Sequence, residues 1–209
     1  MNIRIAIAIL IFAAATISLS AQSGMVPAPQ IAIKAIDTPN IGLHISKPSM
    51  HADHGRNIYG LNFKVKNNNS DDVTHARFLL LSVAGDGRIK GGESFCEKNL
   101  MVGKAQSFSV PLASKFGDAG DHGVLALLDV AYSNGRRGTV SAKDIVEANS
   151  VNRDSTPEAI FSESVSPENR YCPGFCNDCR NIALETCGAG RVKSFSCSET
   201  TCTCSFTCQ

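Results

Sequence analysis

Three cysteines near the C-terminus have a spacing that is used in metal and cluster sites. Cys172, Cys176 and Cys179 form a Cys-x3-Cys-x2-Cys pattern. This spacing matches that of an iron–sulfur cluster in radical enzymes, which needs a reducing compartment and a large barrel around the cluster. Cys-x2-Cys is also a common zinc knuckle, and a site joining Cys176 and Cys179 to the later Cys202 and Cys204 can be drawn. The third possibility is that the sulfurs form disulfide bonds.

The start of the chain decides between these chemistries. Arg4 provides a short positive start, about fifteen uncharged residues follow from Ile5 to Leu19, and small residues come next. This layout predicts a signal peptide over residues 1–23, with cleavage after Ser20 or Ser23. An uncleaved membrane anchor is the alternative, although the apolar run is shorter than the roughly twenty residues that span a bilayer. The protein is therefore expected to be secreted or periplasmic, with no membrane span after the signal is removed.

An exported chain meets an oxidising compartment, where thiols pair and persist as disulfides. Of the nine cysteines, eight lie in residues 172–209, and eight exceed the needs of one zinc site. We therefore predict no metal and no cofactor. Cys96 is the odd one, and we expect a free or intermolecular thiol there, with a bridge to the tail as the alternative. The predicted disulfide cysteines are Cys172, Cys176, Cys179, Cys187, Cys197, Cys202, Cys204 and Cys208.

Local patterns predict how the tail places these sulfurs. Asn177 can cap a helix that ends at Gly188, and on that helix the cysteines follow spacings of three and four along one stripe. Two strands follow, and their cysteines recur at every second residue on one face. Neighbours in Cys-x-Cys point the same way, so they must reach across to the helix. About forty residues bury too little apolar surface to fold without such bridges.

The tail resembles the cysteine-stabilised helix and hairpin of defensins. The matching residues are Cys187, Cys197, Cys202 and Cys204, while Ala183 stands where such peptides place another cysteine. The resemblance implies a small disulfide-rich α+β module that acts on a target protein or a membrane. Eight cysteines can pair in many ways, and the spacing leaves the connectivity open.

The middle of the chain predicts β-strands. Apolar residues alternate with polar ones in segments such as 59–67, and 76–84 is a continuous apolar run typical of a central strand. Asp86-Gly87 and Asn134-Gly135 are turn candidates. Several short strands separated by turns indicate a β-sandwich, which we place at residues 30–148. Residues 142–148 fit a last strand or a short helix.

Residues about 59–92 resemble the immunoglobulin-like modules of secreted bacterial proteins. These modules show a strand that ends in Val-x-Asn, a polar turn, an apolar strand and an Asp-x-Gly turn. The resemblance implies an immunoglobulin-like β-sandwich used for binding or assembly, without catalytic residues. The fold class is therefore mainly β, with residues 149–171 as a linker that Ile160 and Phe161 tether, and residues 172–209 as the disulfide-rich module. The matching positions are Val65, Asn67, Ser70, Val73, 79–83, Asp86 and Gly87.

No residue set nominates an enzyme. His51, Asp53 and His54 could approach a metal, but their segment has no pattern that fixes their directions, so we interpret them as loop residues. The sequence lacks a nucleophile elbow and a phosphate-binding glycine loop, so no catalytic residue is predicted, although a hydrolase is not excluded. Without Arg4, 19 basic side chains face 19 acidic ones, so nucleic acid is not an expected partner.

Two functions follow from these observations. The first is a secreted, non-enzymatic binding or structural protein with an unknown protein partner. The alternative is a secreted effector or inhibitor that acts through the defensin-like tail. Residues 167–209 carry four basic and four acidic side chains, whereas peptides that disrupt membranes are usually cationic. This balance disfavours an antimicrobial role and leaves protein inhibition open.

Overall fold

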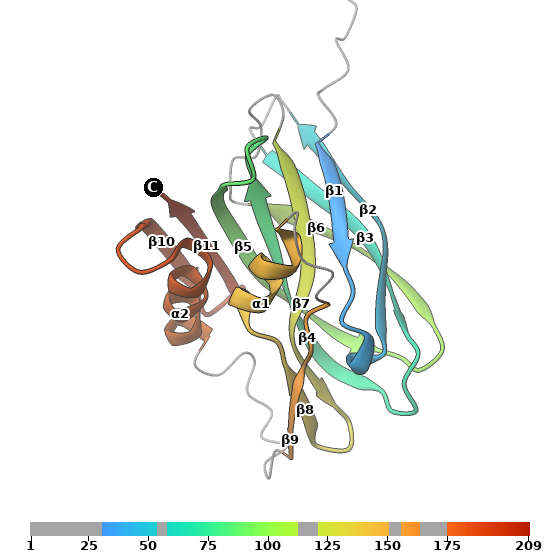
Figure 1. Cartoon of the computed structure of the whole chain (residues 1–209). Coiled ribbons are helices and arrows are strands. Elements are labelled where there is room, and N and C mark those ends of the chain that lie inside the picture. The colour runs from blue at the N-terminus through green and yellow to red at the C-terminus, as the bar shows by residue number, and fades with distance from the viewer. Residues whose placement is uncertain (1–30, 54–57, 113–120, 151–155, 164–174) are drawn as a thin grey trace, which may run out of the picture.

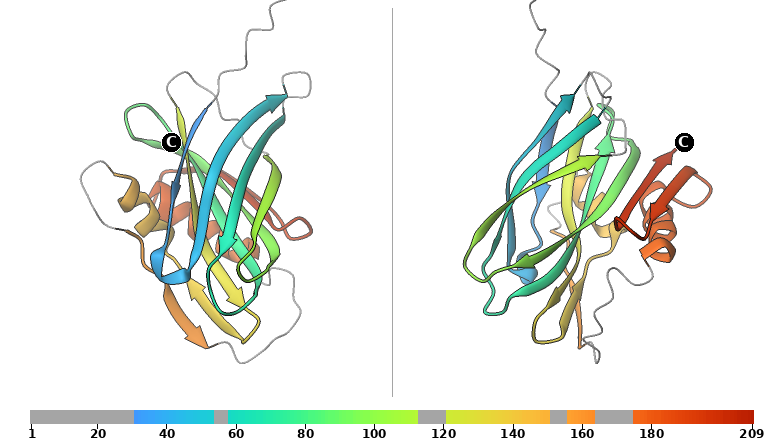
Figure 2. Two further views of the ribbon diagram at one scale, coloured as in Figure 1. Left: turned by 90° about the vertical axis from the view of Figure 1, so that its right-hand side faces the viewer. Right: turned by 180° about the vertical axis from the view of Figure 1, so that it is seen from behind.

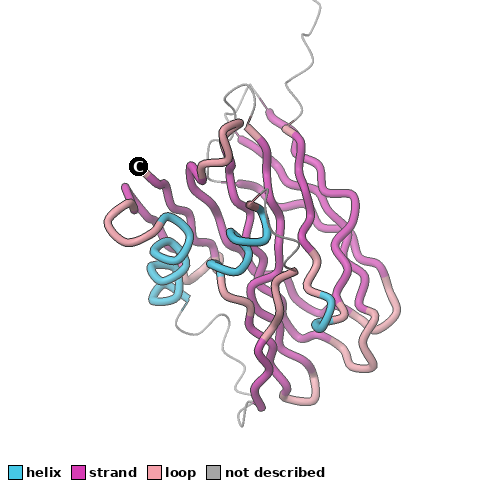
Figure 3. Tube along the Cα trace, viewed as in Figure 1, coloured by secondary structure: helices cyan, strands magenta, loops and turns pink. Residues whose placement is uncertain are grey.

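The computed structural model describes residues 31–53, 58–112, 121–150, 156–163 and 175–209. It is mainly β, with a few short helical segments between the strands (Figure 3). The predicted signal peptide and most of the predicted linker lie outside the described residues. The elements, in chain order, are β1 (Ala32–Ile36), η1 (Pro39–Ile41), β2 (Leu43–Asp53), β3 (Ile58–Asn67), β4 (Val73–Val83), β5 (Ile89–Leu100), β6 (Ala105–Leu112), β7 (His122–Tyr132), β8 (Arg136–Thr139), α1 (Ala142–Asn149), β9 (Ile160–Glu163), α2 (Phe175–Cys187), β10 (Val192–Ser198) and β11 (Thr203–Cys208).

The strands form two sheets that face each other, called the sandwich below (Figure 1). The smaller sheet has the order β2-β3-β6, and the larger one runs β10-β11-β5-β4-β7-β8-β9. β1 joins the larger sheet by pairing in parallel with the first half of β7, beside the stretch that β8 covers. The other strand pairs are antiparallel.

Aromatic rings fill the space between the sheets. Phe63 of β3 lies 5.2 Å from Phe78 of β4 and 5.9 Å from Phe95 of β5, measured between ring centroids. On β3, the alternation predicted from sequence is confirmed, because Leu61, Phe63 and Val65 are buried while Lys64 and Lys66 are exposed. Central strand β4 is buried on both of its faces from Ala76 onward, as its continuous apolar run predicts.

Two turns predicted from sequence are present. Gly87 and Gly135 both adopt a φ of +85°, where glycine has no steric cost, and their amides donate to Ala84 O and Tyr132 O. In each turn the preceding Asp86 or Asn134 accepts a backbone hydrogen bond from the residue two positions on. These turns set the β4–β5 and β7–β8 registers.

Both α-helices lie on the face of the larger sheet that points away from the smaller sheet, and Figure 2 shows this arrangement from behind for α2. Residues 142–149 form a helix rather than a strand, and the Ser141 hydroxyl caps it by accepting from Lys143 N. Within the predicted linker, Ile160 and Phe161 form part of β9, which pairs with β8. The ring of Phe161 lies 3.7 Å below the guanidinium of Arg136.

Candidate functional site

The disulfide-bonded C-terminal segment is the candidate site, and its sulfurs come from one helix and one hairpin. α2 begins at Phe175, two residues before the predicted cap Asn177. It ends at Cys187 and is followed by the predicted stop Gly188, which has a φ of +86° and donates to Leu184 O. β10 and β11 pair so that Phe195 faces Phe206 and Cys197 faces Cys204. The helix therefore lies against a two-stranded surface, as the sequence predicts.

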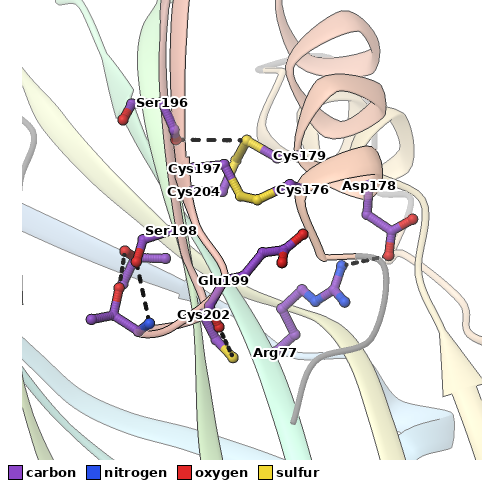
Figure 4. Close-up of a disulfide and its surroundings, with 12 residues drawn as sticks. Arg77, Cys176, Asp178, Cys179, Ser196, Cys197, Ser198, Glu199, Cys202 and Cys204 are labelled. Atoms are coloured by element: carbon purple, nitrogen blue, oxygen red, sulfur yellow. Dashed lines mark hydrogen bonds and ion pairs between the residues drawn. A yellow bond between two sulfur atoms is a disulfide. The ribbon is translucent and has the colours of Figure 1, made fainter. Parts of the chain in front are cut away.

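Three disulfides join α2 to the hairpin, and they fix the distance of the helix from both strands. Their Cα–Cα distances are 5.4–5.6 Å, which is within the ordinary range. The prediction that the strand cysteines reach across to the helix is confirmed for these six residues. Two of the bridges can be followed in Figure 4. The pairs are Cys176–Cys197, Cys179–Cys204 and Cys187–Cys208.

The three other cysteines have different surroundings. Cys202 is buried in the turn just before β11, with a φ of +50°, and its Sγ lies 3.7 Å from Glu199 O. Cys172 lies outside the described residues. Cys96 is half-buried on β5, opposite Arg77 of β4. A bridge at Cys172 and Cys202, and a free or intermolecular thiol at Cys96, therefore stay predictions.

The hairpin continues the larger sheet of the sandwich. β11 pairs with β5, with Cys204 opposite Ser94 and Phe206 opposite Gly92. The division into a sandwich at 30–148 and a module at 172–209 stays a prediction about folding units. The hydrogen-bonded ladder nevertheless runs from one to the other without a break (Figure 1).

Two glycines make this junction possible. A Cβ on Gly91 would come within 3.0 Å of the Phe206 carbonyl oxygen, and a Cβ on Gly92 would lie 2.8 Å from the tip of the Phe206 ring. Real side chains do not tolerate such distances, so any larger residue must displace the hairpin. The Phe206 ring fills the space above Gly92 and is only 2% exposed. Fully burying such a ring contributes roughly 1.5–3 kcal/mol.

Polar contacts fix α2 to the sandwich on its inner side. Nη1 of Arg77, a buried residue on β4, donates to Oδ2 of Asp178 at 3.1 Å (Figure 4). Burial alone would lower the pKa of Arg77, but the nearby Asp129, Cys96 and Asp178 together raise it above its usual value. The guanidinium therefore remains charged beneath the first turn of α2.

A second polar contact comes from the other end of α2. Oε2 of Glu185 accepts from Ala142 N at 3.1 Å and from the Ser141 hydroxyl at 3.3 Å. The carboxylate therefore lies at the positive N-terminal end of α1, where negative charge is stabilising. Both acidic side chains of α2 are thus paired with groups earlier in the chain, Asp178 with β4 and Glu185 with α1.

The outer side of the segment has the opposite character. Arg180 and Leu184 follow Cys176 at intervals of four, so they share its stripe on α2. Because Cys176 is bonded to Cys197, this stripe lies on the side of the helix nearest β10. Leu184 is 38% exposed and Phe195 on β10 is 50% exposed, and both are among the large apolar side chains that remain accessible.

The histidine candidates do not assemble a metal site in the described residues. No group of three or more His, Cys, Asp or Glu side chains there could hold a metal ion. His51 lies on β2 rather than in a loop, with its ring above Gly60 and its Nδ1 3.2 Å from Asn62 Nδ2. Asp53 lies in the same strand, and His54 is outside the described residues. The interpretation of the segment as a loop was therefore wrong for His51 and Asp53.

Another histidine has an acidic partner that the sequence analysis did not find. His44 Nδ1 lies 2.7 Å from Asp37 Oδ2, and Asp37 Oδ1 accepts from Ile45 N. Both side chains are about half exposed, and the pair closes the corner between β1 and β2. It therefore has a structural explanation as a turn contact.

Arg77, Glu185 and the Gly91-Gly92 pair hold the hairpin in place, and the sequence analysis missed all of them. The available signal was the glycine pair inside a run that otherwise continues as a strand. None of the described helices is long and apolar enough to cross a membrane. No protein-family model, curated protein or solved structure matches this chain.

Proposed function

We propose that this chain is a secreted or periplasmic, non-enzymatic binding protein that presents its disulfide-bonded hairpin to a protein partner. The single observation that carries the proposal is the exposure of Phe195 on an edge strand that a disulfide fixes two residues away, at Cys197. An accessible aromatic ring on a rigid support is typical of the anchor residues of protein interfaces. A rigid support also lowers the conformational entropy lost on binding.

Two further observations support this proposal. Three disulfides persist only in an oxidising compartment, which agrees with export. Two facing, mainly antiparallel sheets agree with an immunoglobulin-like module, a scaffold that commonly carries binding surfaces at its edges. The alternative, an effector or inhibitor that acts through the tail, has no contact in its favour beyond the spacing of the cysteines.

The test is site-specific photocrosslinking with the full oxidised chain. A photoreactive residue replaces Phe195 in one variant and Ile160 in a control, because Ile160 is a 79% exposed apolar residue on the opposite edge strand β9. After incubation with the fluid into which the protein is exported, we expect a discrete adduct from position 195 only. Reduction of the disulfides before incubation should abolish this adduct.

Two results would contradict the proposal. Equal adducts at positions 195 and 160 would show only non-specific apolar contact. An adduct at 195 that survives full reduction would show that the disulfide-bonded shape of the hairpin is not what the partner recognises.

A further inference from the structure

The outer edge of β10 is the last edge of the larger sheet, and no described strand pairs with it. An edge strand presents backbone N–H and C=O groups of alternate residues, which can pair with another extended chain. The register to β11 is regular from Ser194 to Ser198, with an irregularity between Val192 and Ser194. The usable edge is therefore short, about the length that one short peptide strand would cover.

The side chains beside this edge differ between its two faces. On the α2 face, Phe195 and Cys197 alternate along β10, and the Arg180 and Leu184 stripe of α2 lies above them. On the other face, β10 carries only the hydroxyls of Ser194, Ser196 and Ser198. A chain added here would therefore meet an apolar and basic surface on one face and small hydroxyl groups on the other.

The charge near this edge depends on which charged side chains are paired elsewhere and which remain exposed beside β10. Segment 167–209 is balanced in total, but Asp178 contacts Arg77 and Glu185 contacts the start of α1. Arg180, on the same stripe of α2 as Cys176, and Lys193, in β10 itself, are both exposed. With Asp178 and Glu185 paired, the exposed Arg180, Arg191 and Lys193 outnumber Glu199, which is exposed in the turn after β10. This part of the surface is therefore cationic overall, although residues 167–209 are neutral in total.

We infer that β10 accepts an extended peptide segment of a partner protein by strand addition, with an apolar side chain of that segment beside Phe195 and Leu184 and flanking carboxylates near Arg180 and Lys193. This inference deepens the proposed function and rests on it. A second copy of the chain fits less well. An antiparallel two-fold pairing would place both α2 helices on the same face of the joined sheet and turn the Arg180 side of each toward the other.

The probe is a fluorescein-labelled seven-residue peptide, capped at both ends and added to the full oxidised chain. Threonine occupies its first, third, fifth and seventh positions, glutamate its second and sixth, and valine its fourth. We expect saturable binding by fluorescence anisotropy. Alternate amides of Ser194–Ser198 should gain protection from hydrogen exchange, while those of β9 on the opposite edge should not change.

Control peptides separate the contribution of backbone hydrogen bonds to binding from the contribution of the peptide's charges. Two versions carry N-methyl groups on the odd-numbered or on the even-numbered amides, and we expect only one of them to lose binding, since an added strand bonds through one edge. A version with lysine in place of glutamate should bind at least about fivefold more weakly. If both methylated peptides bind like the parent, or if the lysine peptide binds as tightly, the inference is overturned.

Charge-reversal variants provide the matched test on the protein. Arg180→Glu and Lys193→Glu should each weaken binding about two- to fivefold, as expected for an exposed ion pair. Lys66→Glu makes the same change of charge at an exposed position of β3 in the smaller sheet, and it should leave binding unchanged. Equal effects of all three variants would show that only net charge matters and would refute a defined site.

Further outcomes distinguish a failure of the strand-addition inference from a failure of the proposed binding function. Concentration-dependent dimers with protected β10 amides in the absence of peptide would identify a second copy as the occupant and overturn the inference. If no peptide binds but the photoreactive residue at 195 still forms a specific adduct, strand addition is wrong and the proposed binding function stands. If neither experiment gives a signal, both fall.

Discussion

The buried Cys179–Cys204 bridge should contribute more to the free energy of unfolding than the half-buried Cys176–Cys197 bridge. The burial of the two bridges sets the size of the expected difference. The perturbation is the pairwise replacement of each bridge by alanine, which leaves no unpaired thiol from that bridge. The bridges close loops of 25 and 21 residues. In the chain-entropy model, closing loops of this size stabilises the folded state by about 3.5 and about 3.3 kcal/mol. Loop closure alone therefore predicts nearly equal contributions from the two bridges.

The two bridges differ in how tightly their sulfurs are packed, and this difference should change their contributions to stability. Cys179 and Cys204 are fully buried, whereas Cys176 and Cys197 retain some exposure. Each sulfur removed from the packed interior leaves a gap the size of a methyl group, which costs about 1 kcal/mol. We therefore expect a total loss of about 5–6 kcal/mol for Cys179→Ala/Cys204→Ala and about 3–4 kcal/mol for Cys176→Ala/Cys197→Ala.

The assay is equilibrium urea denaturation followed by far-ultraviolet circular dichroism, with free energies of unfolding from linear extrapolation. Circular dichroism is suitable because the chain has no tryptophan. Equal losses for the two double variants, or a larger loss for the half-buried bridge, would refute the reasoning that packing at the junction between α2 and the sheet adds to the tether.

Three further outcomes are expected. Phe206→Ala should cost about 3–5 kcal/mol of unfolding free energy by urea denaturation, and Phe195→Ala less than about 1 kcal/mol, because only the first ring is buried; similar costs would contradict this. Burial lowers the pKa of His75 despite the opposing effect of Asp129, so the folded state binds that proton less tightly than the unfolded chain. Stability should therefore decline as pH falls from about 6.5 through the lowered pKa, His75→Gln should remove this part of the decline, and an unchanged pH profile in that variant would count against it. Peptide mapping of the unreduced protein by mass spectrometry should find Cys172 joined to Cys202, since the six other tail cysteines pair among themselves; Cys172 or Cys202 joined to any other cysteine would refute the prediction that the tail forms four bridges of its own.

Local patterns in the sequence predict the elements whose residues repeat at a fixed interval. The alternation around Phe63 and the continuous run of β4 identify their strands, and the spacing of three and four from Cys176 to Cys187 identifies α2 and its bonded face. In these segments the spacing of the apolar residues or cysteines along the sequence directly reflects which side of the helix or strand is buried. Asn177 is a good cap by type, but the prediction of a cap there was wrong, because Asn177 lies inside α2, which begins at Phe175.

Strand β5 could not be predicted in the same way. Gly91, Gly92 and Glu93 lower the strand propensity of Ile89–Leu100, and their burial depends on β11, which comes much later in the chain. The pairing of β11 with β5 is a long-range event without a local signature. The same holds for Arg77, because a lone arginine inside an apolar strand does not reveal that Asp178 will lie above it.

The position of β11 has a consequence for how the molecule is completed. The final strand of the chain lies inside the sheet, with β10 on one side and β5 on the other. β5 therefore keeps one flank unpaired until β11, a strand much later in the sequence, has paired with it. Removal of Thr203–Cys208 would expose the flanks of β5 and β10 together and release two of the three disulfides, so cleavage before β11 should lead to aggregation.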